Sequence, residues 1–293
     1  MKKNRGLFTF PARRVLMKYY PEFETLLLEQ EAGATTLLLK FLNILTRYFT
    51  ENSDFSREEQ VKKIQFFYEK VTEAHPLMAI FPNLYKVIMD TFQKGEQTVP
   101  EIIEIFREAL NEKIDKTAET ASSLIKDGAR VFSFSHSSIV RKSLVRAMQK
   151  DITFTVHTTE CRPVNEAVNL AKFLARYEIE VMLYTDSAME KAIENCDLAM
   201  VGTDWYWKEG FVNKIGTGLV SRLCREKKIP LYILTDSSKK MSSPPKDWSK
   251  DNHPASLILA ESIPNITVFN PYFESIAFTK PGGIIINGEL NRF

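Results

Sequence analysis

The spacing of apolar residues changes near residue 126, and this change constrains the fold more than any other feature of the sequence. Beyond that point, short β-rich runs alternate with segments of helical period. The β-rich runs are 130–135, 152–157, 180–184, 197–202, 230–234, 266–269 and 283–286. The helical segments between them are 139–150, 165–177, 188–195 and 215–226. Such alternation predicts right-handed βαβ crossovers and a parallel sheet with helices on both faces.

The first part of the chain has a helical period instead. Apolar residues recur at helical spacing in 36–49, 58–72 and 83–94. Pro100 then opens a long helix that continues to residue 125. We therefore predict an α/β protein with an N-terminal helical domain over 1–127 and a Rossmann-like domain over 128–293, and 293 residues suffice for two domains.

Composition excludes several classes of protein. The net charge of +2 is too small to indicate a nucleic-acid or membrane partner, and no run of 18 apolar residues predicts a membrane span. The three cysteines, Cys161, Cys196 and Cys224, lie far apart and form no C-x-x-C pair. This pattern argues against a disulfide framework and against a zinc site. We expect a cytoplasmic protein without a metal or another cofactor.

Polar loops follow the first two predicted strands of the sheet. Ligands of open parallel sheets bind beyond the carboxyl ends of the strands, so these loops are candidates for a site. Ser135, His136, Ser137 and Ser138 open a helix, where they can cap it or hold a phosphate on free backbone N–H groups. In the next loop, Glu160 and Arg162 can grip a sugar hydroxyl and a phosphate, or form an ordinary surface ion pair.

An aspartate follows the fourth strand of the predicted sheet. Asp204 comes directly after a buried apolar run and Gly202. A low dielectric there would raise the pKa of its carboxyl and suit it to proton transfer. The alternative is a turn or capping aspartate, the role that Asp186 can also fill after the third strand.

Two further loops carry cations on the same side of the predicted sheet. Asn213 and Lys214 precede Gly216 at a predicted helix start, an arrangement that suits phosphate, although the P-loop spacing is absent. Lys239 follows the fifth strand. Five successive loops thus offer groups suited to a phosphorylated polyol, and their convergence is the evidence for a site.

The ordered motifs resemble one protein family. They are Ser-His-Ser-Ser, Glu-Cys-Arg-Pro, Asp-Ser-Ala, Gly-Thr-Asp, Asn-Lys-Ile-Gly-Thr, Asp-Ser-Ser-Lys and Asn-Pro-Tyr-Phe-Glu, within roughly 128–289. The chain is similar to the family of the alpha, beta and delta subunits of eukaryotic translation initiation factor 2B. That family also contains methylthioribose-1-phosphate isomerase and archaeal ribose-1,5-bisphosphate isomerase. Asn-Lys-Ile-Gly-Thr is the most specific motif.

The resemblance implies an incomplete catalytic pair. The isomerases of this family use an aspartate, whose counterpart is Asp204, and a cysteine, whose position Ser137 occupies. A hydroxyl is much harder to deprotonate than a thiol. A serine in place of the cysteine should therefore lose general acid–base catalysis and lower the reaction rate by ~10²–10⁴-fold. Cys161, on the next loop, can in principle substitute. The family's Arg-Gly-Ala phosphate motif is also incomplete, since Gly33-Ala34 lacks the arginine and only Arg13-Arg14 offers a replacement.

The binding side of the site is better retained. The resemblance carries phosphate-binding roles to Arg162, Asn213, Lys214 and Lys239. The full set of expected ligand-binding residues is His136, Ser138, Glu160, Arg162, Asn213, Lys214 and Lys239, with Asp204 and Ser137 as catalytic positions if the chain is an isomerase.

Three functions fit these features. The preferred hypothesis is a non-catalytic regulatory or assembly protein similar to the initiation factor 2B alpha subunit. It would bind a phosphorylated sugar or nucleotide, pair with itself or with related subunits, and contact neither nucleic acid nor membrane directly. The alternative is an aldose–ketose isomerase acting on a phosphorylated pentose. The third is an assembly protein with a vestigial pocket, in which Trp205 and Trp207 narrow the site, stack on a ligand or pack at an interface.

Overall fold

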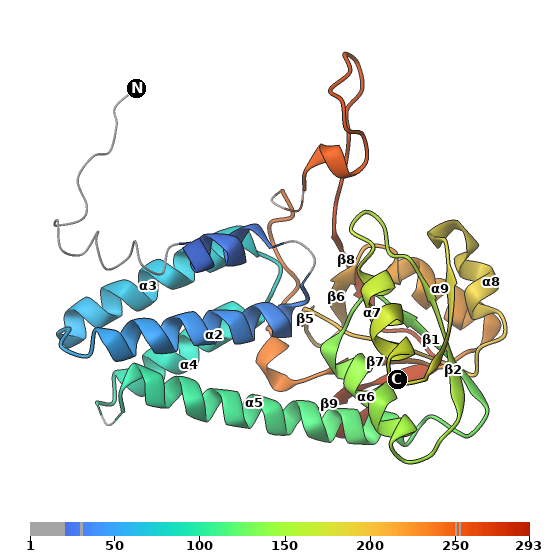
Figure 1. The fold of residues 1–293 in the computed structure, drawn as a ribbon, viewed down its shortest axis with the longest axis horizontal. Helices are drawn as coiled ribbons and strands as arrows, with labels where there is room; N and C mark the ends of the chain where they lie inside the picture. The colour runs from blue at the N-terminus through green and yellow to red at the C-terminus, as the bar shows by residue number, and fades with distance from the viewer. Residues whose placement is uncertain (1–20, 30–31, 96, 250, 252) are drawn as a thin grey trace.

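A computed structural model describes residues 21–29, 32–95, 97–249, 251 and 253–293 (Figure 1). Arg13 and Arg14, the proposed replacement for the family's phosphate-binding arginine, lie outside the described residues. Among the described helices, none has both the length and the apolar run that a bilayer crossing requires. No cluster of metal-ligating side chains occurs in the described part of the chain.

Four helices follow a short helical segment over 21–28. They are α2 (Ala34–Glu51), α3 (Arg57–Ala74), α4 (Ile80–Phe92) and α5 (Val99–Ser122). Local sequence fixes two of their starts, because Ser56 and Thr98 each form a reciprocal capping box with a glutamate three residues later. The helix predicted from residue 83 begins at Ile80 instead. Pro82 is tolerated in its first turn, where a backbone N–H would lack an intrahelical partner anyway.

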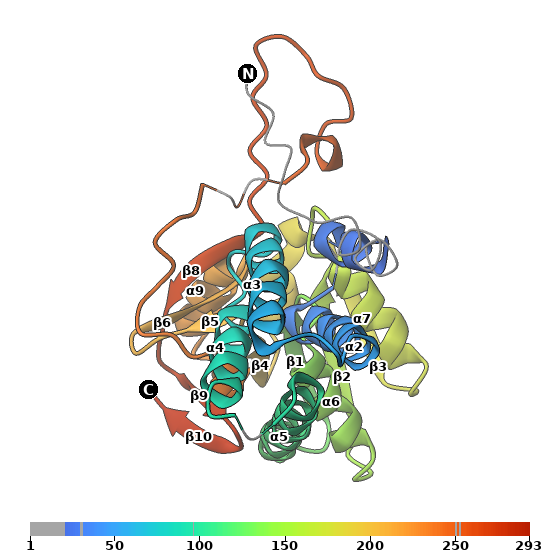
Figure 2. The same cartoon turned by 90° about the vertical axis from the view of Figure 1, so that its left-hand side faces the viewer.

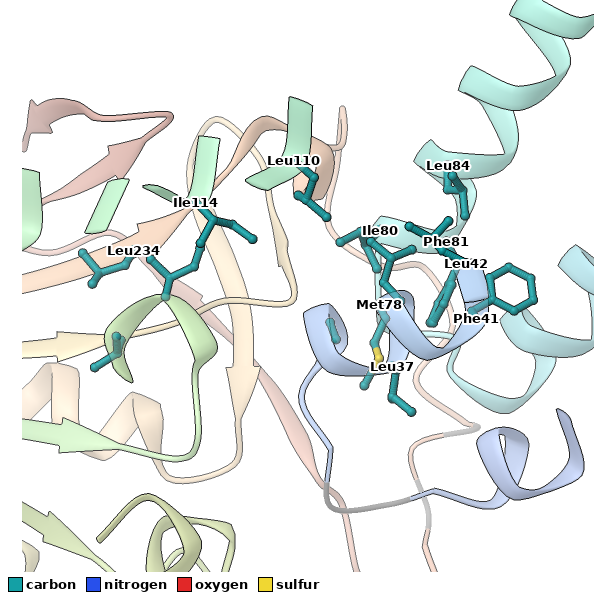
Figure 3. Packing of buried hydrophobic residues seen from close by; sticks show 14 of the residues in the cluster. Leu37, Phe41, Leu42, Met78, Ile80, Phe81, Leu84, Leu110, Ile114 and Leu234 are labelled. Atoms are coloured by element: carbon teal, nitrogen blue, oxygen red, sulfur yellow. The ribbon is translucent and has the colours of Figure 1, made fainter. Parts of the chain in front are cut away.

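The helical part packs through aromatic and branched side chains. Leu37, Phe41 and Leu42 of α2 meet Phe81 and Leu84 of α4 (Figure 3), and all five are almost completely buried. The same hydrophobic cluster continues through α5 to the sheet residue Leu234. Helix α5 runs from the helical part along the sheet (Figure 1) and so connects the two parts of the molecule. The domain boundary predicted after residue 127 falls in the connection between α5 and β1. One hydrophobic core continues across that boundary.

The predicted parallel sheet is present and has seven strands in the order β10-β9-β7-β4-β1-β2-β3. All neighbours are parallel except β10, which pairs antiparallel with β9. The strands are β1 (Ala129–Phe134), β2 (Phe154–Thr159), β3 (Glu180–Tyr184), β4 (Leu198–Val201), β7 (Leu231–Thr235), β9 (Gly282–Ile286) and β10 (Glu289–Arg292).

Helices cover both faces of this sheet. They are α6 (Ser138–Met148), α7 (Glu166–Ala175), α8 (Met189–Ile193) and α9 (Thr217–Lys227). Successive strand side chains point to opposite faces. Val131 accordingly joins the hydrophobic cluster that includes residues of α5, α6 and α7, whereas Phe132 joins the cluster that includes residues of α8 and α9.

A small antiparallel sheet was not predicted. It consists of β5 (Trp205–Tyr206), β6 (Gly210–Lys214) and β8 (Phe273–Ala277), in that order. The strand predicted over 266–269 was wrong, because these residues have no strand partner. They lie in a segment between the 3-10 turn η3 (Ala255–Leu257) and β8 that projects from the body (Figures 1 and 2). Phe269 is 81% exposed there, so its apolar character reflects no buried strand.

Candidate functional site

Two small adjoining cavities lie at the carboxyl ends of the central strands. We name them the helix-end cavity and the carboxylate cavity, and their volumes are about 40 and 50 Å³. Gly33, Ser135, His136 and Asp204 line both cavities. The helix-end cavity is also lined by Ala34, Thr35, Thr36, Phe134, Ser137, Ser138, Gly202, Thr203, Asn213 and Lys239, and the carboxylate cavity by Ala32, Met78, Glu166, Lys214, Tyr272 and Phe273.

The first turns of α2 and α6 meet across the helix-end cavity. Ser137 is the N-cap of α6, and its hydroxyl accepts the Val140 N–H at 3.5 Å. Gly33 is the N-cap of α2 and provides no side chain to cap that helix. The two segments lie so close that a Cβ on Gly33 would be 3.2 Å from the His136 carbonyl oxygen. Two helix N-termini, each with partial positive charge, therefore face one small volume.

Asp204 lines both cavities and is partly buried. Burial raises the pKa of its carboxyl, while Lys239, the Ala34 N–H and Lys214 oppose that rise. The direction of this shift is the one expected from the sequence. The backbone of Asp204 is fixed on both sides, since its N–H donates to Val212 O and its carbonyl accepts the Ala79 N–H, each at 3.0 Å.

Lys239 supplies a cation to the helix-end cavity. It ends the 3-10 turn η2 (Ser237–Lys239), is 5% exposed, and donates from Nζ to the Thr203 carbonyl at 2.8 Å. Asn213 lines the same cavity, and its amide donates to Thr217 Oγ1 at 3.0 Å. Both side chains are therefore held by the strand-end loops themselves.

The carboxylate cavity contains a buried ion pair. Lys214 Nζ lies 3.3 Å from Glu166 Oε1, and the two side chains are 6% and 7% exposed. Ser135 Oγ donates to the same oxygen at 3.0 Å, and Lys214 also lies over the ring of Tyr272, 4.3 Å from its centroid. Burial raises the pKa of Glu166, and Lys214 opposes that shift. Glu166 Oε2 is buried and has no hydrogen-bond partner within the described structure.

Glu166 was missed by sequence reasoning. It opens α7, and an acidic residue in the first turn of a helix is ordinary because it complements the helix dipole. In the folded chain its buried carboxylate pairs with Lys214, which is distant in sequence. The one available signal was its position three residues after Pro163, in the loop that already held two candidate residues.

The structure brings most of the predicted residues together. His136, Ser137, Ser138, Asp204, Asn213 and Lys239 line the helix-end cavity, and Lys214 lines the carboxylate cavity. Glu160 and Arg162 line neither of them. The Arg162 guanidinium donates to the Leu257 carbonyl at 3.0 Å, and its backbone N–H donates to Asp186 at 2.7 Å. Asp186 and Arg162 thus organise the loop after β2 without lining the cavities.

Cys161 does not offer a replacement for the missing thiolate. The residue is fully buried, and its sulfur accepts the Ser135 N–H at 3.1 Å. Burial raises the pKa of this thiol well above its usual range, and Glu166 adds to that rise. A thiol in that state is protonated at neutral pH and is a poor nucleophile or base.

The N-terminus of α9 does not serve as the expected phosphate site. Glu274 Oε1 accepts the backbone N–H groups of Gly216 and Gly218, at 2.6 and 2.9 Å. The chain's own carboxylate therefore occupies the position that a phosphate would take. Asn213 and Lys214 instead contribute through side chains that line the cavities.

Replacing Glu274 with alanine should destabilise the fold by about 1–2 kcal/mol, the usual cost of losing an N-terminal helix cap. The reason is that two N–H groups of α9 would lose their acceptor. Urea unfolding followed by circular dichroism measures the change. An unchanged midpoint would show that water replaces the carboxylate at no cost.

Trp205 and Trp207 are packing residues in this structure. Trp205 Nε1 donates to the Ser243 carbonyl at 2.9 Å. Trp207 is 9% exposed, and its ring covers Gly210, where a Cβ would approach it to 2.8 Å. Neither ring lines the helix-end or the carboxylate cavity. The two tryptophans therefore stabilise the small antiparallel sheet.

The sequence profile of the Initiation factor 2 subunit family matches residues 30–274. The chain belongs to this family. It is 30% identical over 212 residues to a putative translation initiation factor eIF-2B subunit 2-like protein of Pyrococcus furiosus, covering 72% of this chain and 75% of that protein. It is 27% identical over 199 residues to ribose 1,5-bisphosphate isomerase of Methanocaldococcus jannaschii, covering 67% and 64%.

Solved structures of this initiation factor 2 subunit family share the fold. The translation initiation factor eIF-2B of Pyrococcus horikoshii OT3 superposes with a TM-score of 0.76 at 23% identity, covering 93% of this chain and 96% of that one. A tetrameric eIF2B-beta2-delta2 complex from C. thermophilum gives 0.64 at 17% identity, covering 85% and 88%. The family thus includes subunits of oligomeric complexes as well as sugar-phosphate isomerases, and membership alone does not choose between them.

Proposed function

We propose that this family member binds a small phosphorylated polyol or nucleotide in the helix-end cavity and acts as a non-catalytic regulatory or assembly protein. The activity would resemble that of the initiation factor 2B alpha subunit, in a homodimer or with related subunits. A cytoplasmic location accords with three free, buried cysteines. One observation carries the proposal, namely that the N-termini of α2 and α6 face the same cavity as Lys239.

This arrangement suits a phosphate for electrostatic reasons. Each helix N-terminus carries roughly half a positive charge, and its free N–H groups point at a bound anion. Lys239 adds a full charge that is buried and held in place by Thr203. The hydroxyls of Ser137 and Ser138 supply further donors at the same end.

The size of the site indicates how a ligand would enter. Cavities of about 40 and 50 Å³ are far below the roughly 300–1,000 Å³ of typical small-molecule sites. A sugar phosphate would therefore fit only if the first turn of α2 moves away from the loop before α6. Gly33 permits the close approach of those segments in the present state.

The same site lacks a complete set of catalytic groups for isomerisation by the family's pair. Ser137 occupies the cysteine position and serves as a helix cap. Cys161 is buried as a protonated thiol. Asp204 remains as a carboxyl suited to proton transfer, without the thiol with which the family's isomerases pair it. These features favour binding over turnover.

Replacing Lys239 with methionine should weaken binding of a sugar phosphate by ~10–100-fold, because a charge-assisted contact to the phosphate is lost in a low dielectric. Calorimetric titration with ribose 5-phosphate and adenosine monophosphate measures this. Lys240→Met, an exposed neighbour, is the matched control and should leave affinity unchanged. Equal affinity in both variants, or no binding to the unmodified protein, would contradict the proposal.

An aldose–ketose isomerase is the second candidate, and one observation favours it. Asp204 and His136 both line both cavities. Burial raises the pKa of Asp204, while burial and Arg141 lower that of His136, so both groups are moved toward neutral forms that can exchange protons. Incubation with ribose 1,5-bisphosphate and with methylthioribose 1-phosphate tests this candidate. Ketose formation that Asp204→Asn abolishes would replace the non-catalytic proposal.

A further inference from the structure

The carboxylate cavity has no role in the phosphate site described above. It adjoins the helix-end cavity through Gly33, Ser135, His136 and Asp204, which line both. A ligand held by its phosphate at the α2 and α6 N-termini would extend toward Glu166 and Lys214. The groups at this second end therefore determine which molecule fits beyond the phosphate.

The charges at the two ends of the site differ. At the helix-end cavity, Lys239 and two helix N-termini supply positive charge, and Asp204, which lines both cavities, is the one carboxyl among the described lining residues. At the carboxylate cavity, the single cation, Lys214, is already paired with Glu166 at 3.3 Å. Asp204 borders that end as a further carboxyl. No surplus positive charge remains there among the described residues.

Glu166 also has an unused acceptor. Its Oε1 receives the Ser135 hydroxyl and lies beside Lys214, whereas its Oε2 is buried with no hydrogen-bond partner among the residues described. A carboxylate oxygen only accepts hydrogen bonds while it is ionised. Buried polar atoms without a partner are uncommon in folded proteins and call for an explanation such as an absent ligand.

Tyr272 is not a free platform for a nucleobase. Lys214 Nζ lies 4.3 Å from its ring centroid, and the His253 ring stacks on it at 3.5 Å. A nucleobase would have to displace one of these partners in order to stack. The aromatic residue at this end is therefore already engaged, unlike the exposed rings that bind bases.

We propose that Glu166 reads the unphosphorylated end of the ligand, so that the site accepts a polyol monophosphate and rejects both a bisphosphate and a nucleotide. A ligand hydroxyl would donate to Glu166 Oε2. A second phosphate would instead meet Glu166 and Asp204 without a cation to balance it, and unpaired like charges are an effective means of rejecting a competitor. This inference rests on the proposed binding function and names the class of ligand.

Titration calorimetry on the full chain tests the inference with four probes: ribose 5-phosphate, ribose 1,5-bisphosphate, adenosine monophosphate and inorganic phosphate. We expect the monophosphate to bind at least about tenfold more tightly than the bisphosphate or the nucleotide, a difference of roughly 1.4 kcal/mol. In Glu166→Gln, the ratio of the monophosphate to the bisphosphate affinity should fall about tenfold. Glu226→Gln, an exposed glutamate on α9, is the control and should leave the ratio unchanged.

The outcomes separate this inference from the proposed function. Equal binding of the monophosphate and the bisphosphate, tighter binding of the nucleotide, or an unchanged ratio in Glu166→Gln would overturn the role of Glu166 while leaving a phosphate site in place. Failure of all four probes to bind would overturn both. The ratio in the unmodified protein decides the question even if the Glu166 variant does not fold.

Discussion

Lys214→Met should destabilise the folded protein by about 3–5 kcal/mol at neutral pH, the usual cost of breaking a buried ion pair by removing one partner. The variant leaves the Glu166 carboxyl, whose side chain is only 7% exposed, without its cation. Ser135 alone would then satisfy the carboxylate. Few single substitutions outside the hydrophobic core should cost as much.

The destabilisation should depend on pH in a defined direction. Burial raises the pKa of Glu166 above its ordinary value of 4.5, so the folded state binds more protons than the unfolded state between the two pKa values. The protonated Glu166 carboxyl contributes its full stabilisation at pH values below its pKa in the unfolded chain. This contribution is lost as the pH rises through the pKa of Glu166 in the folded protein. Removing Lys214 raises the folded pKa further. The cost should therefore be small near pH 4 and grow toward pH 7.

Urea unfolding at several pH values measures this effect. The double variant Lys214→Met with Glu166→Gln should recover most of the stability, because no charge then remains buried. Lys172→Met, on the exposed side of α7, should change stability by less than about 0.5 kcal/mol. A loss in Lys214→Met that is equal at pH 4 and pH 7 would show that packing, and not the charge of Glu166, is responsible.

Gly282→Ala should destabilise the folded protein by at least about 4 kcal/mol, a loss large enough to prevent folded protein from accumulating; losses of this size belong to severe steric mechanisms. Gly282 has φ of +148° at the start of β9, and a Cβ there would lie 2.1 Å from the Leu231 carbonyl oxygen. That oxygen belongs to the backbone of the neighbouring strand β7, whose Leu231 is paired with Gly282. Neither β7 nor β9 can move to relieve this contact without disturbing the pairing of the sheet.

Gly128 provides the matched control for this substitution. It also has a positive φ, +75°, but a Cβ there would meet nothing within 4 Å. Gly128→Ala should therefore cost only the backbone strain of about 1–2 kcal/mol. Thermal and chemical unfolding of both variants gives their loss of stability. The comparison separates the cost of backbone strain from the cost of the steric clash of the new Cβ. Similar losses in the two variants would contradict the steric explanation.

The parallel sheet was predictable because its signal is local. The run 130–135 is mostly apolar through Val131, Phe132 and Phe134, and the run 230–234 is apolar throughout, as expected of buried strands; the structure places β1 and β7 there. The small antiparallel sheet was not predictable from local sequence. Its strand β5 has only two residues, and β6 forms a strand by pairing with β8, which is distant in sequence. The run 266–269 had a strand's composition but no partner.

The site was predictable in part for the same reason. Asp204 and Lys239 stand directly after buried strands, and the fold brings the ends of such strands together. Glu166 and the capping role of Glu274 depend on contacts between residues distant in sequence. The contribution of α2 also depends on tertiary packing, because only the folded chain places Gly33 beside His136.

The helical part is tied to the site by hydrogen bonds from α4 and its preceding loop. Asn83 donates to the carbonyl oxygens of Ser238 and Lys240, at 2.6 and 3.0 Å, and Ala79 donates to that of Asp204. The loops that present Asp204 and Lys239 are thus anchored to a helix of the N-terminal helical part. These three hydrogen bonds join α4 and the residue before it to the loops that line the cavities, so the packing of the helical part helps to fix where Asp204 and Lys239 stand.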